Sequence, residues 1–153
     1  MEFDIVIDAR GKILGRMASF VAKKLLEGKR VAVINAEGAV ITGNPQTILM
    51  KYLRRRWIQG KPRPERGPVQ PRTPDRIVWR TVRGMLPMDK AKGRKALRRL
   101  RVFIGTPEEL SGVQTYDLPI EYTVDNLKPK KRMTSYVTVY WLAKQLGWRG
   151  DVS

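Results

Sequence analysis

Apolar residues in the first part of the chain follow two different spacings. Residues 3–8 and 31–34 form short runs rich in Val and Ile, which is typical of buried strands. Between these runs, apolar residues recur every three or four positions and predict one face of a helix that ends at Gly28. That face consists of Leu14, Met17, Ala18, Val21, Ala22 and Leu25. A strand, a helix and a second strand in about thirty residues form a βαβ unit, so the two strands are expected to be parallel.

The alternation of strand and helix patterns continues along the chain. A third strand is expected at 39–42 and a last one at 101–104. One helix should start at Asn44, another should cover 74–83, and a third should follow Asp89. Asparagine, threonine and aspartate at these three starts are expected to cap the helices with their side chains. Strands alternating with helices indicate the α/β class.

Two segments show no clear periodicity. Residues 59–74 contain five prolines and favour an extended path, on which the intervening arginines would lie against phosphates. Residues 108–153 are mixed, and we expect a C-terminal extension that packs on the same domain, with a helix beginning near Thr134. The chain of 153 residues is long enough for one domain with a core. We expect residues 1–107 to form this single α/β domain.

Positive charge is concentrated in one stretch of the chain. There are 31 Lys and Arg residues against 14 Asp and Glu residues, which gives a formal net charge of +17. Residues 51–101 hold 18 of the basic residues and three of the acidic ones, and so carry +15 of that charge. Repulsion at this density lowers stability unless a polyanion neutralises it. The charge pattern therefore indicates nucleic acid as the partner.

Two missing residue types narrow the possible chemistry. The chain contains no cysteine and no histidine. Disulfides, cysteine-containing zinc sites and thiolate nucleophiles are thus excluded, and the commonest general base near neutral pH is absent. No apolar run approaches the roughly 20 residues that span a bilayer, and no signal-peptide core follows the first residue. We expect a cytoplasmic protein with no enzyme activity, no cofactor, no metal, no small-molecule substrate and no membrane partner.

The loop between the first strand and the first helix contains Gly11 and Gly15, at a place where phosphate-binding loops occur. Only three residues separate the glycines instead of the four in a Walker loop, and Arg16 follows where that loop has lysine. We interpret Gly11 as a turn residue and Gly15 as a point of close packing between helix and sheet. Lys12 and Arg16, at the N-terminus of this helix, would instead hold an RNA phosphate.

Several polar residues lie near the expected strand ends: Asp4, Asp8, Asn35 and Glu37. The carboxyl ends of parallel strands are where α/β enzymes work. Because histidine, cysteine and a convincing phosphate loop are all missing, we expect these residues to cap helices and fix turns. A small nucleotide-binding α/β enzyme is the alternative.

A stripe of arginines runs along the helix expected at 74–83. Its members are Arg72, Arg76, Arg80 and Arg83, at positions i, i+4, i+8 and i+11. The opposite face carries Ile77, Val78, Thr81 and Val82. Ordinary solvent faces mix both charge signs, whereas this one has no acidic partners at helical spacing. Trp57 and Trp79 lie in the same basic stretch and are candidates for base stacking, although core packing is expected for at least one of them.

These residues resemble those of a known family. The relevant segments are IDARGKILGRMAS at 7–19, VINA at 33–36, ITG at 41–43, RTPDRI at 72–77, VRGMLP at 82–87, GR at 93–94 and LRVFIG at 100–105. Together they resemble the ribosomal protein L-thirteen family of the large subunit, in its archaeal or eukaryotic form. Thr106 follows Gly105 where bacterial members have histidine, which points away from the bacterial branch.

The resemblance implies a three-layer α/β/α sandwich on a four-stranded, mainly parallel sheet, with an extended basic loop and a C-terminal extension. It also implies a structural constituent of the large ribosomal subunit that binds large-subunit ribosomal RNA, lies beside other large-subunit proteins and supports subunit assembly. A non-ribosomal RNA- or DNA-packaging protein is a further alternative. The basic residues expected to contact RNA are Lys12, Arg16, Arg54, Arg55, Arg56, Lys61, Arg63, Arg66, Arg72, Arg76, Arg80, Arg83, Lys90, Lys92, Arg94, Lys95, Arg98, Arg99, Lys130, Lys131 and Arg132.

Overall fold

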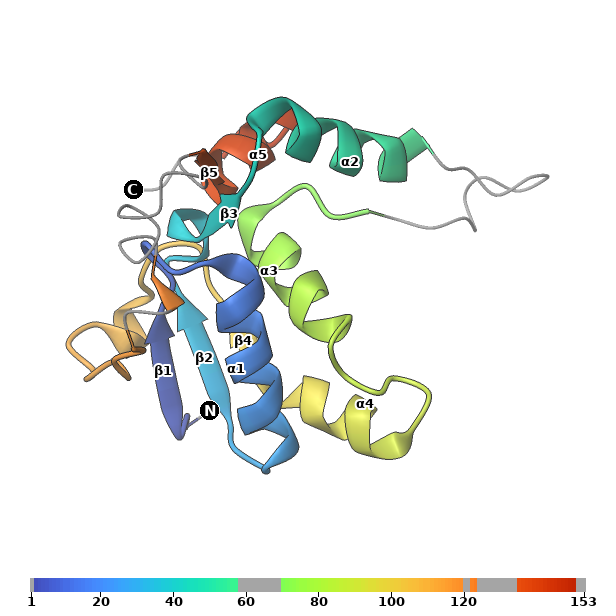
Figure 1. The fold of residues 1–153 in the computed structure, drawn as a ribbon. Coiled ribbons are helices and arrows are strands. Elements are labelled where there is room, and N and C mark those ends of the chain that lie inside the picture. The colour runs from blue at the N-terminus through green and yellow to red at the C-terminus, as the bar shows by residue number, and fades with distance from the viewer. Residues whose placement is uncertain (1, 58–69, 120–121, 124–134, 151–153) are drawn as a thin grey trace.

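A parallel sheet of three strands forms the centre of the molecule (Figure 1). The computed structural model describes residues 2–57, 70–119, 122–123 and 135–150. Strands β1 (Ile5–Asp8), β2 (Val31–Ile34) and β4 (Leu100–Val102) lie in the order β1-β2-β4. All four residues of the central strand β2 are buried, in agreement with its uninterrupted apolar sequence. The predicted βαβ unit is confirmed, because β1 and β2 pair in parallel with Ile5 opposite Val31.

Helices cover one face of this sheet. Helix α1 (Leu14–Leu26), α3 (Pro74–Arg83) and α4 (Ala91–Arg98) pack together there, and their apolar side chains form one core with alternate residues of the strands. All six positions of the apolar face predicted for α1 are buried. Full burial of each Leu, Met or Val side chain among them stabilises the fold by roughly 1.5–3 kcal/mol relative to exposure.

The other face of the sheet differs from the expected three-layer sandwich. Val6, Ala32 and Ile34 point to this face and pack with Leu110 of η3 (Glu108–Leu110), a single 3-10 turn. Within the described residues, this turn together with Phe3 and Phe103 takes the place of a second helical layer. Alternate residues of the strands therefore still point into two apolar clusters, one on each face of the sheet. On this second face, the loop that contains η3 supplies part of the apolar cover.

The strand expected at 39–42 does not belong to the main sheet but to a separate one. β3 (Val40–Thr42) pairs antiparallel with β5 (Tyr136–Thr138) from the C-terminal part of the chain. The pairing explains why the helix expected from Thr134 begins later: α5 (Val139–Gln145) starts only after β5 ends. The Thr138 hydroxyl accepts a hydrogen bond of 3.1 Å from the Trp141 amide and caps the helix. Residues 136–138 are β-branched or aromatic, and the available edge of β3 decides their conformation.

Helix α2 (Pro45–Trp57) extends from β3 over the N-terminal end of α3 (Figure 1). Its predicted start is confirmed, because the Asn44 side chain accepts a hydrogen bond of 2.9 Å from the Gln46 amide. Of its four expected apolar contacts, Ile48 is buried, whereas Leu49, Tyr52 and Leu53 are half-buried. The helix therefore rests on the core mainly through its first turns and leaves its basic C-terminal half accessible.

Other local predictions turn out differently. Thr73 occupies the N-cap position of α3, but its hydroxyl makes no capping hydrogen bond. The N-cap of α4 is Lys90 and not Asp89, again without a side-chain bond. Gly15 is exposed, and a Cβ atom there would meet nothing within 4 Å, so the expectation of close packing is wrong. Gly28, expected at the end of the helix, and Gly11, expected as a turn residue, both have a left-handed conformation, with φ of 95° and 72°.

Candidate nucleic-acid interface

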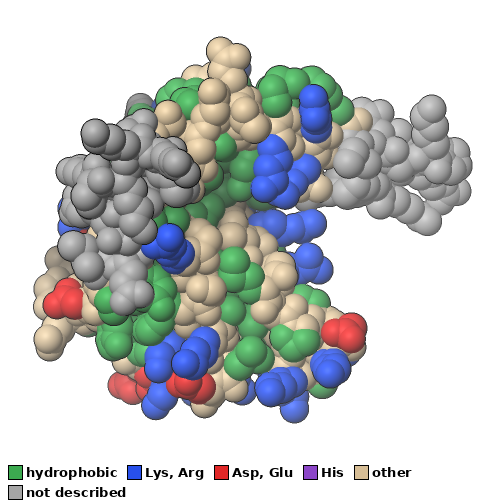
Figure 2. All heavy atoms as spheres, in the orientation of Figure 1, with side chains coloured by type: hydrophobic (Ala, Val, Ile, Leu, Met, Phe, Trp, Pro, Cys, Tyr) green, Lys and Arg blue, Asp and Glu red, His purple; other side chains and the backbone are tan. Residues whose placement is uncertain are grey.

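A cleft lies between α2 and the N-terminal part of α3. One cavity of about 560 Å³ is lined by arginines from both helices. A second cavity of about 510 Å³ shares Gln70 and Arg80 with the first, and a smaller one of about 60 Å³ shares the same two residues with both. Figure 2 shows Lys and Arg side chains gathered where α2 overhangs α3, with no acidic side chain among them on this face.

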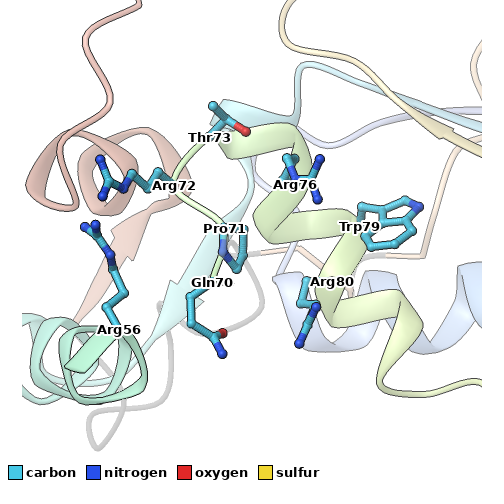
Figure 3. A pocket seen from close by; sticks show the side chains of 8 residues that line it. All are labelled: Arg56, Gln70, Pro71, Arg72, Thr73, Arg76, Trp79 and Arg80. Atoms are coloured by element: carbon cyan, nitrogen blue, oxygen red, sulfur yellow. The ribbon is translucent and has the colours of Figure 1, made fainter. Parts of the chain in front are cut away.

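The larger cavity is lined by four guanidinium groups and by no carboxylate. Its lining residues are Arg56, Gln70, Pro71, Arg72, Thr73, Arg76, Trp79 and Arg80 (Figure 3). None of these arginines forms an ion pair within the described part of the chain. The neighbouring carboxylate of Asp75 accepts a hydrogen bond of 2.9 Å from the Arg76 amide and lines a different cavity, beside β4. The cavity is thus a concentration of unneutralised positive charge.

Arg56 is fixed at one end of this cavity by the C-terminal helix. Its guanidinium donates a hydrogen bond of 2.7 Å to the Leu146 carbonyl, at the end of α5. Cations are favourable at a helix C-terminus, where carbonyl groups lack intrahelical partners. Burial lowers the pKa of Arg56, and the nearby positive charge of Arg72 lowers it further. Figure 3 shows these two guanidinium groups turned toward one another.

Aromatic rings accompany the arginines on both walls. The Arg55 guanidinium lies 5.2 Å from the ring centroid of Tyr52, and that of Arg76 lies 6.0 Å from the ring of Trp79. Burial raises the pKa of the Tyr52 hydroxyl, and the charge of Arg55 opposes this effect. Trp79 packs against the core, as expected for at least one tryptophan, whereas Trp57 at the end of α2 is 63% exposed.

The structure brings the expected residues of α2 and α3 together. Arg55, Arg56, Arg72, Arg76 and Arg80 line the cavities of the cleft. The remaining arginine of the α2 cluster, Arg54, lines a separate cavity along α2. Arg83 is half-buried at the last residue of α3.

A second group of expected residues lies on and around α4. Lys90, Lys92, Arg94, Lys95 and Arg98 are exposed there. Arg99 differs from them because it is half-buried and donates a hydrogen bond of 3.0 Å to the Leu25 carbonyl. Part of its guanidinium is therefore engaged at the C-terminal end of α1.

Lys12 and Arg16 lie at the start of α1 and line none of the cavities between α2 and α3. The backbone amides around Lys12 are already paired: those of Gly11, Lys12 and Ile13 donate to the carbonyls of Gly38, Ala9 and Tyr122. These contacts occupy backbone groups that a phosphate-binding loop would direct at its ligand. The nucleotide-binding alternative thus gains no support from this loop.

Six expected residues lie outside the described part of the chain: Lys61, Arg63, Arg66, Lys130, Lys131 and Arg132. The structure also adds residues to the cleft that the sequence interpretation did not single out as contacts. Lys51 lines the second cavity, and Gln70 lines both. Lys51 precedes Arg55 by one helical turn, so helical spacing would have found it. The position of Gln70, within a stretch without periodicity, carried no comparable signal.

The polar residues at the strand ends fix turns, as expected, but the expected helix capping is not seen: Asn35 is the N-cap of η1 (Ala36–Gly38) and its side chain makes no capping bond. The Asp8 carboxylate accepts hydrogen bonds from the Arg10 backbone and side chain and, at 3.2 Å, from the Asn35 amide. Asn35 has a φ of 54° and accepts a further bond of 3.3 Å from the Thr106 hydroxyl. Glu37 accepts a bond of 3.0 Å from the Gly105 amide. These contacts join the ends of β1 and β2 to the loop after β4.

Comparison with known proteins assigns the family. A family model for ribosomal protein L13 matches residues 3–109. The chain is 48% identical over 146 residues to large ribosomal subunit protein uL13 of Archaeoglobus fulgidus, an alignment that covers 95% of this chain and 88% of that protein. The chain belongs to the ribosomal protein L13 family. The corresponding protein of Methanocaldococcus jannaschii is 44% identical over 144 residues, covering 93% of this chain and 96% of that protein.

Membership of the ribosomal protein L13 family confirms the resemblance found in the sequence, and the two relatives named above are archaeal proteins. The family model spans α2, α3 and α4, which carry the cleft and the exposed basic residues. This is a family of ribosomal structural proteins and not of enzymes. Among the described residues there is no group of acidic side chains that could hold a metal ion, and no helix is long and apolar enough to cross a bilayer.

Proposed function

We propose that this chain is a structural constituent of the large ribosomal subunit that binds large-subunit ribosomal RNA through Arg and Lys contacts to phosphates. The observation that carries the proposal is the cleft between α2 and α3, whose larger cavity is lined by four arginines without an ion-pair partner in the described residues. Membership of the L13 family supports the identity of the polyanion. Arginine suits this role because its planar guanidinium contacts phosphate oxygens in pairs.

The proposed contact residues are all the basic residues expected from the sequence, and those that line the cleft have the strongest structural support. Residues 1–107 would form the RNA-binding domain, and residues 108–153 would form an extension on it. The pairing of β5 with β3 and the bond from Arg56 to Leu146 support this division, because both hold the extension against the domain. Supporting subunit assembly follows from the same surface, since a cation-lined cleft stabilises RNA segments that otherwise repel one another.

The proposed partners are large-subunit ribosomal RNA and neighbouring proteins of that subunit, in the cytoplasm. The decisive experiment is co-sedimentation of the tagged chain with ribosomal particles through a sucrose gradient, followed by crosslinking. We expect the chain to travel with the large subunit and to crosslink to its RNA from α2 and α3. A chain that remains at the top of the gradient would overturn the proposal, and tight, stoichiometric binding of free nucleotide would favour the enzyme alternative.

A further inference from the structure

We propose that the cleft between α2 and α3 binds an unpaired segment of RNA, with one backbone phosphate held between Arg56 and Arg72. This inference rests on the proposed function and specifies the kind of RNA that the cleft receives. Two cavities of about 560 and 510 Å³ adjoin one another in the cleft, with Gln70 and Arg80 in the lining of both.

The phosphate position follows from the arrangement of Arg56 and Arg72. Arg56 spends one of its donors on the Leu146 carbonyl, which fixes the guanidinium and leaves its remaining N–H groups for another acceptor. Arg72 approaches from the segment before α3, and Figure 3 shows the two groups directed to the same side of the cavity. Two like charges so placed repel one another, and a phosphate between them turns this repulsion into attraction on both sides.

The path of the strand follows from the remaining lining residues. Arg76 and Arg80 lie one helical turn apart on the α3 wall, and Arg55 lies on the α2 wall of the second cavity. A strand that leaves the Arg56–Arg72 position therefore meets further cations as it passes Gln70. The Gln70 amide provides a donor and an acceptor between the two cavities, which is suitable for the edge of a base.

An unpaired strand fits these features better than a duplex. Double-stranded RNA presents a convex surface and is recognised through phosphates and 2′-hydroxyls across its wide, shallow minor groove. The cleft is concave, and each cavity has a volume in the range of pockets that enclose small ligands. Unpaired segments bind in grooves that combine cations with aromatic side chains, and Tyr52 and Trp79 supply aromatic side chains on the two walls.

The test compares a cleft variant with a charge-matched control on two RNA probes. The cleft variant is Arg72→Gln with Arg80→Gln, and Arg56 is left intact because it anchors α5. The control is Lys29→Gln with Arg30→Gln, which removes the same charge from the exposed turn between α1 and β2. The probes are a short unstructured oligouridylate and an RNA hairpin of the same length with a continuous stem. Fluorescence anisotropy gives the affinity of the full chain and of each variant.

We expect the cleft variant to bind oligouridylate at least about tenfold more weakly than the control variant, because two charge-assisted contacts are lost. Both variants should lose affinity for the hairpin to a similar, smaller extent. The pair Arg72→Lys with Arg80→Lys should lose an intermediate amount on oligouridylate alone, since it keeps the charge and loses the two-pronged geometry. Thermal melts of each variant verify that it is folded.

Two results would overturn the inference. Equal losses for the cleft and control variants on both probes would mean that RNA is attracted by the overall charge and not by the cleft. A larger loss on the hairpin than on oligouridylate would identify a duplex site. Either result leaves the proposed function intact, because co-sedimentation with the large subunit tests that function separately.

Discussion

Ile77 and Arg76 are adjacent on α3, but they serve different parts of the molecule. Ile77 is 1% exposed in the core, whereas Arg76 is exposed and lines the cleft. Ile77→Ala should lower the free energy of unfolding by roughly 2–4 kcal/mol, the usual effect of emptying a buried branched position. Arg76→Ala with Arg80→Ala should leave that free energy nearly unchanged or raise it, because repulsion among the cleft arginines is relieved. Thermal melts of these variants measure both changes in stability, and filter binding on the same variants measures their RNA affinity.

The RNA affinity of the double arginine variant provides a second check on this assignment. It should fall by an amount that shrinks as the salt concentration rises, because the lost contacts are ionic. Should the arginine variant unfold while Ile77→Ala melts like the unmodified chain, the stripe on α3 would be structural and the predicted orientation of the helix would be wrong.

Asp8 is a residue whose protonation is expected to affect folding. Burial raises the pKa of its carboxyl, but the hydrogen bonds from the Arg10 side chain and backbone and from Asn35 outweigh this effect, and the resulting pKa is below its ordinary value. A lowered pKa in the folded state contributes stability above the unfolded value of about 4, and this contribution is lost as the pH falls through the folded value.

The difference in melting temperature between the unmodified chain and Asp8→Asn should therefore be largest near neutral pH and should close in acid. Melts recorded between neutral and strongly acidic pH test this expectation. Arg10→Gln should show a weaker dependence of the same sign, because the backbone bond from Arg10 to Asp8 remains. A difference that stays constant down to strongly acidic pH would mean that the Asp8 charge contributes nothing to folding.

At the scale of single elements, the sequence predicted those whose partners are near in the chain. The stripe on α1, the parallel pair β1–β2 and the Asn44 cap all follow from spacing or from local side-chain chemistry. The pairing of β3 with β5 did not follow, because nearly a hundred residues separate the two strands and β3 alone fits either sheet. The cleft was predicted in part: its arginines were found from charge, but its shape depends on where the fold holds α2 relative to α3.

Two helix glycines should respond in opposite ways to alanine, although both lie in helical backbone. A Cβ atom at Gly93 of α4 would lie 2.1 Å from the Pro87 carbonyl oxygen, whereas one at Gly15 of α1 would meet nothing within 4 Å. Gly15→Ala should therefore stabilise the chain by up to about 1 kcal/mol through helix propensity and a smaller unfolded ensemble. Gly93→Ala should destabilise it, because the turn at Pro87 has to move away from α4.

Urea denaturation of both glycine variants gives the two signs directly. Circular dichroism at low denaturant serves as the control, since each variant should retain the helix content of the unmodified chain. Stabilisation by Gly93→Ala would show that the contact between Pro87 and α4 is loose enough to open without loss, and the close packing assigned to this turn would be wrong.

The whole molecule separates a nearly neutral sheet region from a strongly charged set of helices. Residues 51–101 carry +15 of the net charge of +17. The described part of this stretch includes the second half of α2, residues 70–73, α3, α4 and the start of β4. The apolar faces of α3 and α4 pack on the sheet, so their basic residues project away from it. This arrangement joins a stable core to a surface that gains stability when anions neutralise it.

The salt dependence of RNA binding tests this arrangement as a whole. Each phosphate neutralised by the protein contributes about −0.7 to −0.9 to the slope of log affinity against log salt concentration. Six contacts, fewer than the exposed basic residues of α2, α3 and α4 together provide, would give a slope near −4 to −5 by the same relation. The cleft variant Arg72→Gln with Arg80→Gln should make the slope shallower by the contribution of about two phosphate contacts. Ile77→Ala should leave the slope unchanged in the folded protein. A slope shallower than about −2 for the unmodified chain would show that most of this charge does not meet phosphate.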